Sequence, residues 1–425
     1  MKKNEEYIVT CIDDTDLNSG VVKIDDMVVF VPNLLIGEKA KIKIVKVNKK
    51  YAFGIIIELL KPSINRQELT CEVAKTCGGC QLQHMSYAYQ LDYKYKHVKK
   101  LFEDIEVKPI LGMDNPWYYR NKAQFPVKIK DGKVQMGFYR QHSNDVVTCK
   151  ECKIQDHVIN EVFSFIQKKI TLKMAQDLRH VFIRHSSTDE IQVVFIGKNE
   201  KNIISLSDQL KNTFANIKSI VFNYNTRNDN VILGDTYKVL YGNDYIIEEC
   251  LGNKVKLHFK AFFQVNPKQM EVLYSQAIKA ANLTGNETCI DMYAGTGTIG
   301  MAVSQHAKSV IGVEIVKEAV DNANDNTKMN HLDHCHYVCQ DATDFAHDHK
   351  EDKIDVIFID PPRKGMTENG IKDTITMQPD KIVYVSCNPK SLSRDLKIFK
   401  EYGYQCEYVQ PVDMFCQTIG LECVA

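Results

Sequence analysis

The chain has 425 residues and balanced charge, with 54 Lys and Arg against 54 Asp and Glu, and 44% of its residues are hydrophobic. These values exclude an acidic disordered protein and a strongly basic nucleic-acid coat, and the length predicts two or three domains. The balance conceals an asymmetry, because residues 1–250 carry a net charge of +5 and residues 251–425 a net charge of −5.

The first ten residues, MKKNEEYIVT, carry charge but no apolar core and no small-residue cleavage site, so we expect no secretory signal. No run approaches the roughly 18 apolar residues of a membrane span. We therefore expect a cytoplasmic monomer with no membrane partner. In a reducing compartment the 14 cysteines are better read as metal ligands, nucleophiles or buried side chains than as disulfides.

Three segments of different character follow one another along the chain. Residues 1–62 consist of short apolar strands between Gly and Asn turns, which predicts a small β-barrel. Residues 63–245 begin with clustered cysteines and continue as strand-rich sequence with an Asp131-Gly132 hairpin signal. Residues 246–425 alternate strands with helices, so we expect an α/β domain with a doubly wound, mainly parallel sheet.

A cluster of cysteines opens the second segment. Cys71, Cys77 and Cys80 lie close together, and Cys149 and Cys152 follow some seventy residues later. Three clustered thiols and a distant fourth can form a Cys₄ site for either Zn²⁺ or a [4Fe–4S] cluster. The Gly-Gly pair between Cys77 and Cys80 favours the cluster, because glycine permits the close backbone approach that a cubane requires.

Basic and aromatic residues are interleaved in two places, an arrangement that suits stacking on RNA bases. Residues 87–100 alternate Tyr with four lysines, and Arg120 and Lys122 follow Trp117-Tyr118-Tyr119. For residues 87–100, an amphipathic helix with a solvated basic face is an equally good interpretation.

A glycine-rich turn predicts a nucleotide cofactor. Gly295-x-Gly297-x-x-Gly300 follows an apolar strand that ends near Asp291, and the next strand ends at Glu314. Glycines allow close approach of the ligand, and an acidic residue at the second strand can bind ribose hydroxyls. NAD is the competing ligand. The C-terminal position of the motif, the acidic residue before the loop and the later IDVIFIDPPRKG favour S-adenosylmethionine, and Asp341 is then expected beside the adenine.

A cysteine at the end of a strand is the candidate nucleophile. Cys387 follows KIVYVS and precedes Asn388-Pro389, which gives a tight exit from the strand. Ligands of open α/β sheets bind at the carboxyl ends of the strands, so the thiol is expected to point into the ligand crevice. The alternative is a structural cysteine in the core.

Four motifs in this order resemble those of the RNA 5-methyluridine methyltransferases, especially the bacterial 23S ribosomal RNA (uracil-5-)-methyltransferases. They are FFQVNP from Phe262, DMYAGTGTIG from Asp291, DPPRKG from Asp360 and SCNPKSLSRDL from Ser386. Residues 1–62 are similar to the TRAM barrel, an OB-type RNA-binding domain that opens this family's chains. The resemblance thus covers nearly the whole chain.

The resemblance implies roles for individual residues. Cys387 would be the nucleophile and Glu422 the general base, although the segment before Glu422 lacks the family's usual Pro-His and His-Val pairs. The pattern C-x5-C-G-G-C with a later cysteine followed by x-Ile-Gln selects Cys152 over Cys149 and favours [4Fe–4S] over zinc. The cluster ligands would be Cys71, Cys77, Cys80 and Cys152. The S-adenosylmethionine pocket would contain Gln264, Tyr293, Gly295, Gly297, Glu314, Asp341 and Asp360.

The chemistry of uracil requires a nucleophile and a base. A thiolate that adds to C6 makes C5 nucleophilic, and a base must then remove the C5 proton before the thiolate leaves. We therefore expect an enzyme that forms 5-methyluridine in RNA, with 23S rRNA as substrate. Alternatives are a tRNA 5-methyluridine enzyme, an RNA 5-methylcytidine enzyme, an amino-methyltransferase and a non-catalytic RNA-binding assembly factor. The sequence around Cys387 disfavours the cytidine enzyme, and Arg363 after Asp-Pro-Pro disfavours the amino-methyltransferase.

Overall fold

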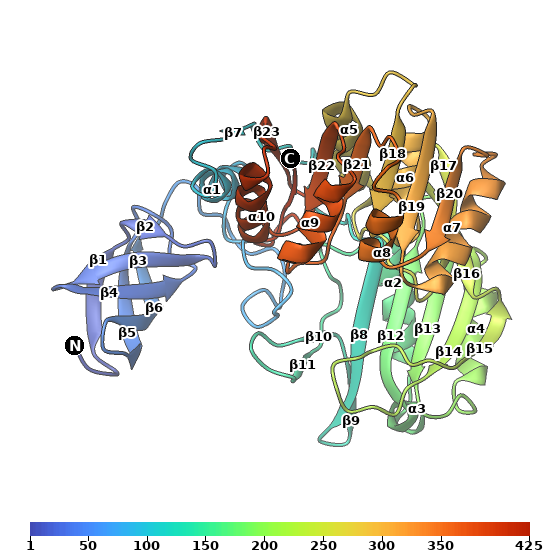
Figure 1. Cartoon of the computed structure of the whole chain (residues 1–425). Helices are drawn as coiled ribbons and strands as arrows, with labels where there is room; N and C mark the ends of the chain where they lie inside the picture. The colour runs from blue at the N-terminus through green and yellow to red at the C-terminus, as the bar shows by residue number, and fades with distance from the viewer.

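The structure is a computed structural model that describes residues 1–425, and it contains three large sheets (Figure 1). The first, coloured blue in Figure 1, stands apart from the rest and encloses its own core of Val, Ile and Ala side chains. Its strand order is β1-β5-β6-β4-β3-β2, with antiparallel pairs except for β4 and β6. The strands are β1 (Glu6–Thr10), β2 (Asp13–Asp14), β3 (Ser19–Ile24), β4 (Met27–Pro32), β5 (Lys39–Val47) and β6 (Tyr51–Lys61).

The second sheet has six strands in the order β15-β14-β13-β12-β8-β9. One of its faces packs against helices that the strand-rich reading of this segment did not include. In α2, for example, Ile159, Val162, Phe163 and Ile166 recur at helical spacing and are fully buried. The strands are β8 (Lys122–Lys130), β9 (Lys133–Met136), β12 (Leu178–His185), β13 (Ile191–Gly197), β14 (Ile217–Tyr224) and β15 (Tyr237–Gly242). The helices are α2 (His157–Lys169), α3 (Leu172–Asp177) and α4 (Ile204–Thr213).

The third sheet confirms the predicted doubly wound architecture. Its order is β20-β19-β18-β21-β22-β24-β23-β7, and the first five strands are parallel to one another. The strands are β7 (Glu106–Val107), β18 (Thr288–Met292), β19 (Ser309–Glu314), β20 (Cys335–Cys339), β21 (Val356–Ile359), β22 (Lys381–Ser386), β23 (Tyr408–Val412) and β24 (Glu422–Val424).

Alternation along these strands explains why helices cover both faces. Phe358 and Val383 point into a core shared with α5, α6 and α7, whereas Ile359 and Tyr384 point into the opposite core with α8, α9 and α10. The helices are α5 (Pro267–Ala281), α6 (Thr298–Ser304), α7 (Lys317–Met329), α8 (Ala342–Asp348), α9 (Glu368–Thr376) and α10 (Pro389–Glu401).

Several smaller elements lie outside the three large sheets. They are α1 (Tyr87–Lys99), the two-stranded ladder β10 (Phe138–Tyr139) and β11 (Val146–Val147), and the hairpin β16 (Tyr245–Cys250) and β17 (Asn253–His258). Helix α1 lies against the C-terminal part of the chain in Figure 1, and β7 pairs with β23 at the edge of the third sheet. The predicted boundaries at residues 62 and 245 remain predictions, since α1 and β7 precede residue 245 but contact the third sheet.

Candidate active site

The glycine-rich turn lies where the sequence places it, between β18 and α6 at the carboxyl edge of the third sheet. Gly295 has a positive φ of 55° and open space where a side chain would project. Its amide donates a hydrogen bond to Glu314 Oε2 (3.0 Å), and Glu314 Oε1 accepts from the amide of Val316 (3.0 Å). The turn and the end of β19 are thereby fixed to each other, with Glu314 only half-buried.

Tyr337 on β20 explains two further glycines and was missed by the sequence analysis. Its hydroxyl donates to the carbonyl of Gly297 (2.7 Å). A Cβ atom at Gly297 or Gly300 would lie 2.5 Å from the Tyr337 ring or hydroxyl. The amide of Gly300 also donates to Asp291 Oδ2 (2.8 Å), and burial raises the pKa of this carboxyl to about 7. The glycine spacing alone gives no indication of this tyrosine.

Three other predicted cofactor residues lie on segments that adjoin the elements of this sheet. Tyr293 follows β18 with a φ of 62°, and burial and then Asp341 raise the pKa of its phenol. Asp341 is exposed and accepts a hydrogen bond from the amide of Thr343 at the start of α8 (2.8 Å). Gln264 is buried in the segment between β17 and α5.

Two exposed apolar side chains at this edge were not among the predicted residues. Phe262 is 67% exposed and Ile315, directly after Glu314, is 65% exposed. The Thr296 hydroxyl donates to the carbonyl of Phe262 (3.5 Å), which places this segment beside the glycine turn. Exposed apolar surface next to carboxylates can hold the flat base and the ribose of a nucleoside. The sequence could have indicated Ile315, because it is an apolar residue directly after the acid that ends the strand.

The strand register brings the predicted nucleophile and base together. β22 and β24 are antiparallel and pair Ser386 with Cys423, so Cys387 and Glu422 directly adjoin this last pair on the two strands. Asp360 follows β21, the parallel neighbour of β22 on the other side. Three residues far apart in sequence therefore end on adjacent strands at one edge of the sheet.

Electrostatics supports this proximity. Burial, followed by the charges of Glu422 and Asp360, raises the pKa of the Cys387 thiol to about 11. Burial, reinforced by Asp360, raises the pKa of Glu422 well above its usual range. Burial also raises the pKa of Asp360 to about 7. The site thus contains two acids that favour their protonated forms beside a thiol.

Arg363 is the cation that opposes these shifts, and the sequence analysis gave it no catalytic role. Its charge lowers the pKa of both Cys387 and Glu422. The loop that carries it is fixed to the start of α10, because Asn388 Nδ2 donates to the Arg363 carbonyl (3.0 Å) and Ser391 Oγ donates to it as well (3.3 Å). The guanidinium is exposed and free to contact an anion.

The clustered cysteines lie near one another outside the third sheet, in the segments that precede α1 and α2. After burial, the charges of other cysteines raise the pKa of Cys77, Cys80 and Cys152. Cys149 is buried and shows the same influence. However, no three His, Cys, Asp or Glu side chains of the chain are arranged so that they could hold a metal ion.

The predicted RNA-binding cations are placed differently from the expectation. In α1, Lys94 is fully buried and Lys96 pairs with Asp13 and Asp14 of the first sheet (3.3 and 3.2 Å). Burial lowers the pKa of Lys122 to about 8. Residues 87–100 therefore form neither a free RNA-stacking surface nor a uniformly solvated basic face, because α1 packs between two parts of the molecule.

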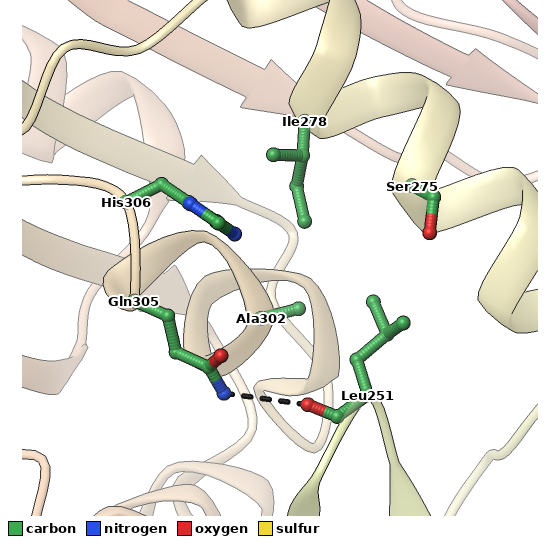
Figure 2. A pocket seen from close by; sticks show the side chains of 6 residues that line it. All are labelled: Leu251, Ser275, Ile278, Ala302, Gln305 and His306. Carbon is green, nitrogen blue, oxygen red and sulfur yellow. Dashed lines mark hydrogen bonds between the residues drawn. The ribbon is translucent and has the colours of Figure 1, made fainter.

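A separate cavity of about 290 Å³ lies between α5, α6 and the turn after β16 (Figure 2). Gln305 Nε2 donates to the carbonyl of Leu251 (3.3 Å) across its rim. It is lined by Leu251, Ser275, Ile278, Ala302, Gln305 and His306. None of the predicted site residues contributes to this cavity. None of the helices combines the length and the apolar character that a membrane span requires.

Comparisons with known proteins agree with the arrangement. Residues 86–425 match the tRNA (Uracil-5-)-methyltransferase family, and residues 3–57 match the TRAM domain. An uncharacterized RNA methyltransferase of Halalkalibacterium halodurans is 42% identical, with 100% of this chain and 97% of the relative covered. One from Clostridium tetani is 38% identical, with 100% and 96% covered.

A solved structure is similar over the whole chain. The structure of Pyrococcus abyssi tRNA (uracil-54, C5)-methyltransferase in complex with S-adenosyl-L-homocysteine has a TM-score of 0.76 and 25% identity, and 98% of each chain is covered. The predicted family, the TRAM domain and the methyltransferase fold are therefore confirmed.

Proposed function

Because the chain belongs to the tRNA (uracil-5-)-methyltransferase family, we propose that Cys387 and Glu422 methylate C5 of a uridine in RNA, with S-adenosylmethionine as methyl donor. The observation that carries this proposal is the pairing of β22 with β24, because a thiol and a buried carboxyl directly adjoin the last pair of this ladder. The glycine turn lies two strands away in the same sheet. A non-catalytic RNA-binding factor would have no need of this pair.

The thiol acts first. Cys387 as thiolate attacks C6 of the uracil, a C6–S bond forms, and the electron pair of the C5–C6 double bond moves toward O4. Because the pKa of the thiol is about 11, Cys387 must lose its proton to water as the uracil enters the site. Arg363 favours the thiolate, and its exposed guanidinium is placed to attract an RNA phosphate.

The cofactor supplies an electrophilic methyl group that C5 of the activated ring attacks. The pocket residues fit such a ligand: the space above Gly295 is open, Glu314 retains acceptor capacity beyond its two amide bonds, and Ile315 and Phe262 present apolar surface. We assign the ribose to Glu314 and the adenine to the neighbourhood of Asp341. Gln264, Tyr293, Gly297 and Asp360 complete the assigned pocket.

Glu422 acts last. It takes the proton from C5, the electron pair restores the C5–C6 double bond, and the C6–S bond breaks to release the Cys387 thiolate. Burial and Asp360 make this carboxyl a stronger base than an exposed glutamate, since they raise its pKa. Because the raised pKa favours the protonated carboxyl, Glu422 must lose its own proton before it can accept the C5 proton.

We propose 23S rRNA as the substrate, in the cytoplasm, with the chain acting as a monomer. A tRNA substrate is the second candidate, because the P. abyssi enzyme with 98% mutual coverage is a tRNA methyltransferase. In either RNA the target uridine must be flipped out or presented in a loop to reach Cys387.

Nucleoside analysis tests the reaction and the substrate together. Unmodified 23S rRNA and unmodified tRNA are incubated separately with the protein and S-adenosylmethionine, digested, and examined by mass spectrometry. We expect 5-methyluridine from rRNA. Methylated nucleoside from tRNA alone would assign the second substrate. 5-Methylcytidine, methyladenosine or no product would contradict the proposal.

We also propose that Cys71, Cys77, Cys80 and Cys152 hold a [4Fe–4S] cluster with a structural role. The thiols are not arranged to hold a metal ion in this structure, but an all-cysteine donor set suits iron–sulfur, and the environment of a buried cation supports the proposal. The Nε atom of Arg120 is buried without a hydrogen-bond partner, and its charge acts on Cys80 and Cys152. A negatively charged cluster would compensate this guanidinium.

The segment after Cys80 shows what such a cluster would support. The amides of Gln81 and Leu82 both donate to the carbonyl of Gln417 (3.0 and 2.9 Å), in the segment that leads to Glu422. Protein prepared without oxygen should contain about four irons per chain. Cys152→Ser should lose the iron, and Cys149→Ser should retain it. Stoichiometric zinc without iron would contradict the proposal.

A further inference from the structure

A buried ion pair lies outside the active site, where α1 packs on residues 413–421. The side chains of Lys94 and Asp413 are 1% and 0% exposed, and Lys94 Nζ donates to Asp413 Oδ1 (2.5 Å). The same ammonium donates to the carbonyls of Phe415 (3.2 Å) and Gly420 (2.7 Å). All three ammonium protons are therefore directed to one short segment of chain.

This segment joins β23 to β24, so its two ends flank the proposed base. Val412 at the end of β23 pairs with Glu422, and Asp413 follows directly. Gly420 lies two residues before Glu422. Lys94 thus joins Asp413, which follows the strand partner of Glu422, to Gly420, which lies just before Glu422.

Other side chains of α1 also form hydrogen bonds with this segment, and Lys94 is the charged member of the group. The Tyr87 hydroxyl donates to Asp413 Oδ2 (2.8 Å). Gln90 exchanges two hydrogen bonds with Gln417, to its side chain (2.9 Å) and from its amide (3.1 Å). The connection is a closed polar network in which Lys94 is the cation.

We propose that Lys94 is a positioning residue for the reaction: it holds residues 413–421 so that the Glu422 carboxyl stands at the C5 proton. This inference rests on the proposed role of Glu422 as base. A buried ion pair is a weak source of net stability, but it selects one arrangement of the groups that it joins. Lys94 touches neither the thiol nor the cofactor pocket, so it acts through the position of Glu422.

The proposal predicts a defect in one step. Without Lys94, addition of Cys387 and methyl transfer should proceed, whereas removal of the C5 proton should slow. Covalent protein–RNA adduct should then accumulate on ordinary uridine RNA. A displacement of about 1 Å costs on the order of 10²-fold in such steps, so we expect resolution to slow by roughly 10- to 100-fold.

The experiment compares single-turnover adduct formation and resolution in four full-length variants, with adduct measured as the protein–RNA species that survives denaturing electrophoresis. Lys94→Met leaves Asp413 unpaired, so Lys94→Met/Asp413→Asn is included to remove both charges and preserve folding. Lys168→Met, at an exposed lysine of α2, is the matched control. Glu422→Gln reports loss of the base itself.

We expect either Lys94 variant that folds to accumulate adduct, as Glu422→Gln does, while Lys168→Met does not. Wild-type resolution in the folded Lys94 variants would overturn the proposal, and so would an equal loss in every step. If Glu422→Gln resolves its adduct normally, the assignment of the base fails. That failure is distinct, because this variant leaves the Lys94 network intact.

Discussion

The catalytic edge and the α1 junction both bury charged groups, but they treat them in opposite ways. At the edge, Asp291, Asp360 and Glu422 form no ion pair, and burial raises the pKa of each. At the junction, Lys94 and Asp413 are bonded to each other and to the surrounding backbone. Unpaired burial makes a group reactive, whereas paired burial holds a segment in place.

The largest expected effect tests the reactive side of this comparison. Cys387→Ala should abolish both 5-methyluridine formation and covalent adduct, because no other thiol lies opposite Glu422. Radiolabelled methyl transfer to RNA measures turnover, and circular dichroism shows that the fold is kept. Residual methylation of uridine by this variant would contradict the thiol-adduct mechanism.

The stability of two variants sharpens the comparison directly. Asp413→Asn leaves Lys94 buried and unpaired, so it should destabilise the protein by about 3–5 kcal/mol.

Glu422→Gln should raise the unfolding midpoint at pH 8. The reason is that a carboxyl whose pKa is raised in the folded state stabilises the fold at pH values below its ordinary pKa. This stabilisation is lost as the pH rises through the raised pKa. The gain should shrink at pH 5. Calorimetry at both pH values checks the signs, and a loss in both variants would break the comparison.

The same Glu422→Gln variant should fail at the last chemical step. Resolution of the adduct should slow by about 10²-fold or more, while its formation continues. Rapid-quench measurement of adduct and free methylated RNA separates the two steps. Normal turnover would mean that another group or a water removes the proton.

Glu314→Ala should weaken S-adenosylmethionine binding by roughly 10- to 100-fold, as expected for losing charge-assisted hydrogen bonds worth about 1.5–3 kcal/mol. Isothermal titration with cofactor and with RNA checks the effect. RNA affinity should remain unchanged. Equal weakening for both ligands would indicate a folding defect and not a ribose contact.

The smallest effect concerns Arg363, whose positive charge partly offsets the negative charges at the catalytic edge. Arg363→Gln should raise the pKa of Cys387, so adduct formation near pH 7.5 should slow by up to roughly tenfold and its pH profile should shift to higher pH. Formation should rise with pH in both proteins, because the thiolate fraction increases. Lys364→Gln, the neighbouring exposed cation, is the control and should leave the profile unchanged.

The sequence predicted the elements that depend on local pattern. Strand and helix alternation after residue 246 gave the doubly wound sheet, and the glycine turn identified Glu314 as its partner. The motif resemblance predicts Cys387 and Glu422, and the structure places β22 and β24 next to each other. Each of these features is encoded within one motif or one repeat of the pattern.

Features that depend on packing between distant segments could not be predicted. Nothing in YAYQLDYKYKHVKK distinguishes the buried Lys94 from Lys96, because the distinction arises from Asp413, some 320 residues away. Tyr337 is one aromatic residue among 20 tyrosines until β20 pairs with β19. Helix α2 has clear helical spacing and could have been found.

Trapping with fluorinated RNA tests the central claim most directly. Fluorine at C5 cannot leave as a cation, so substrate RNA with 5-fluorouridine at the target should stop after methyl transfer. We predict a stable protein–RNA adduct that forms only with S-adenosylmethionine, and peptide mass spectrometry should find the methylated nucleotide on Cys387. No adduct, or an adduct on another residue, would contradict the mechanism.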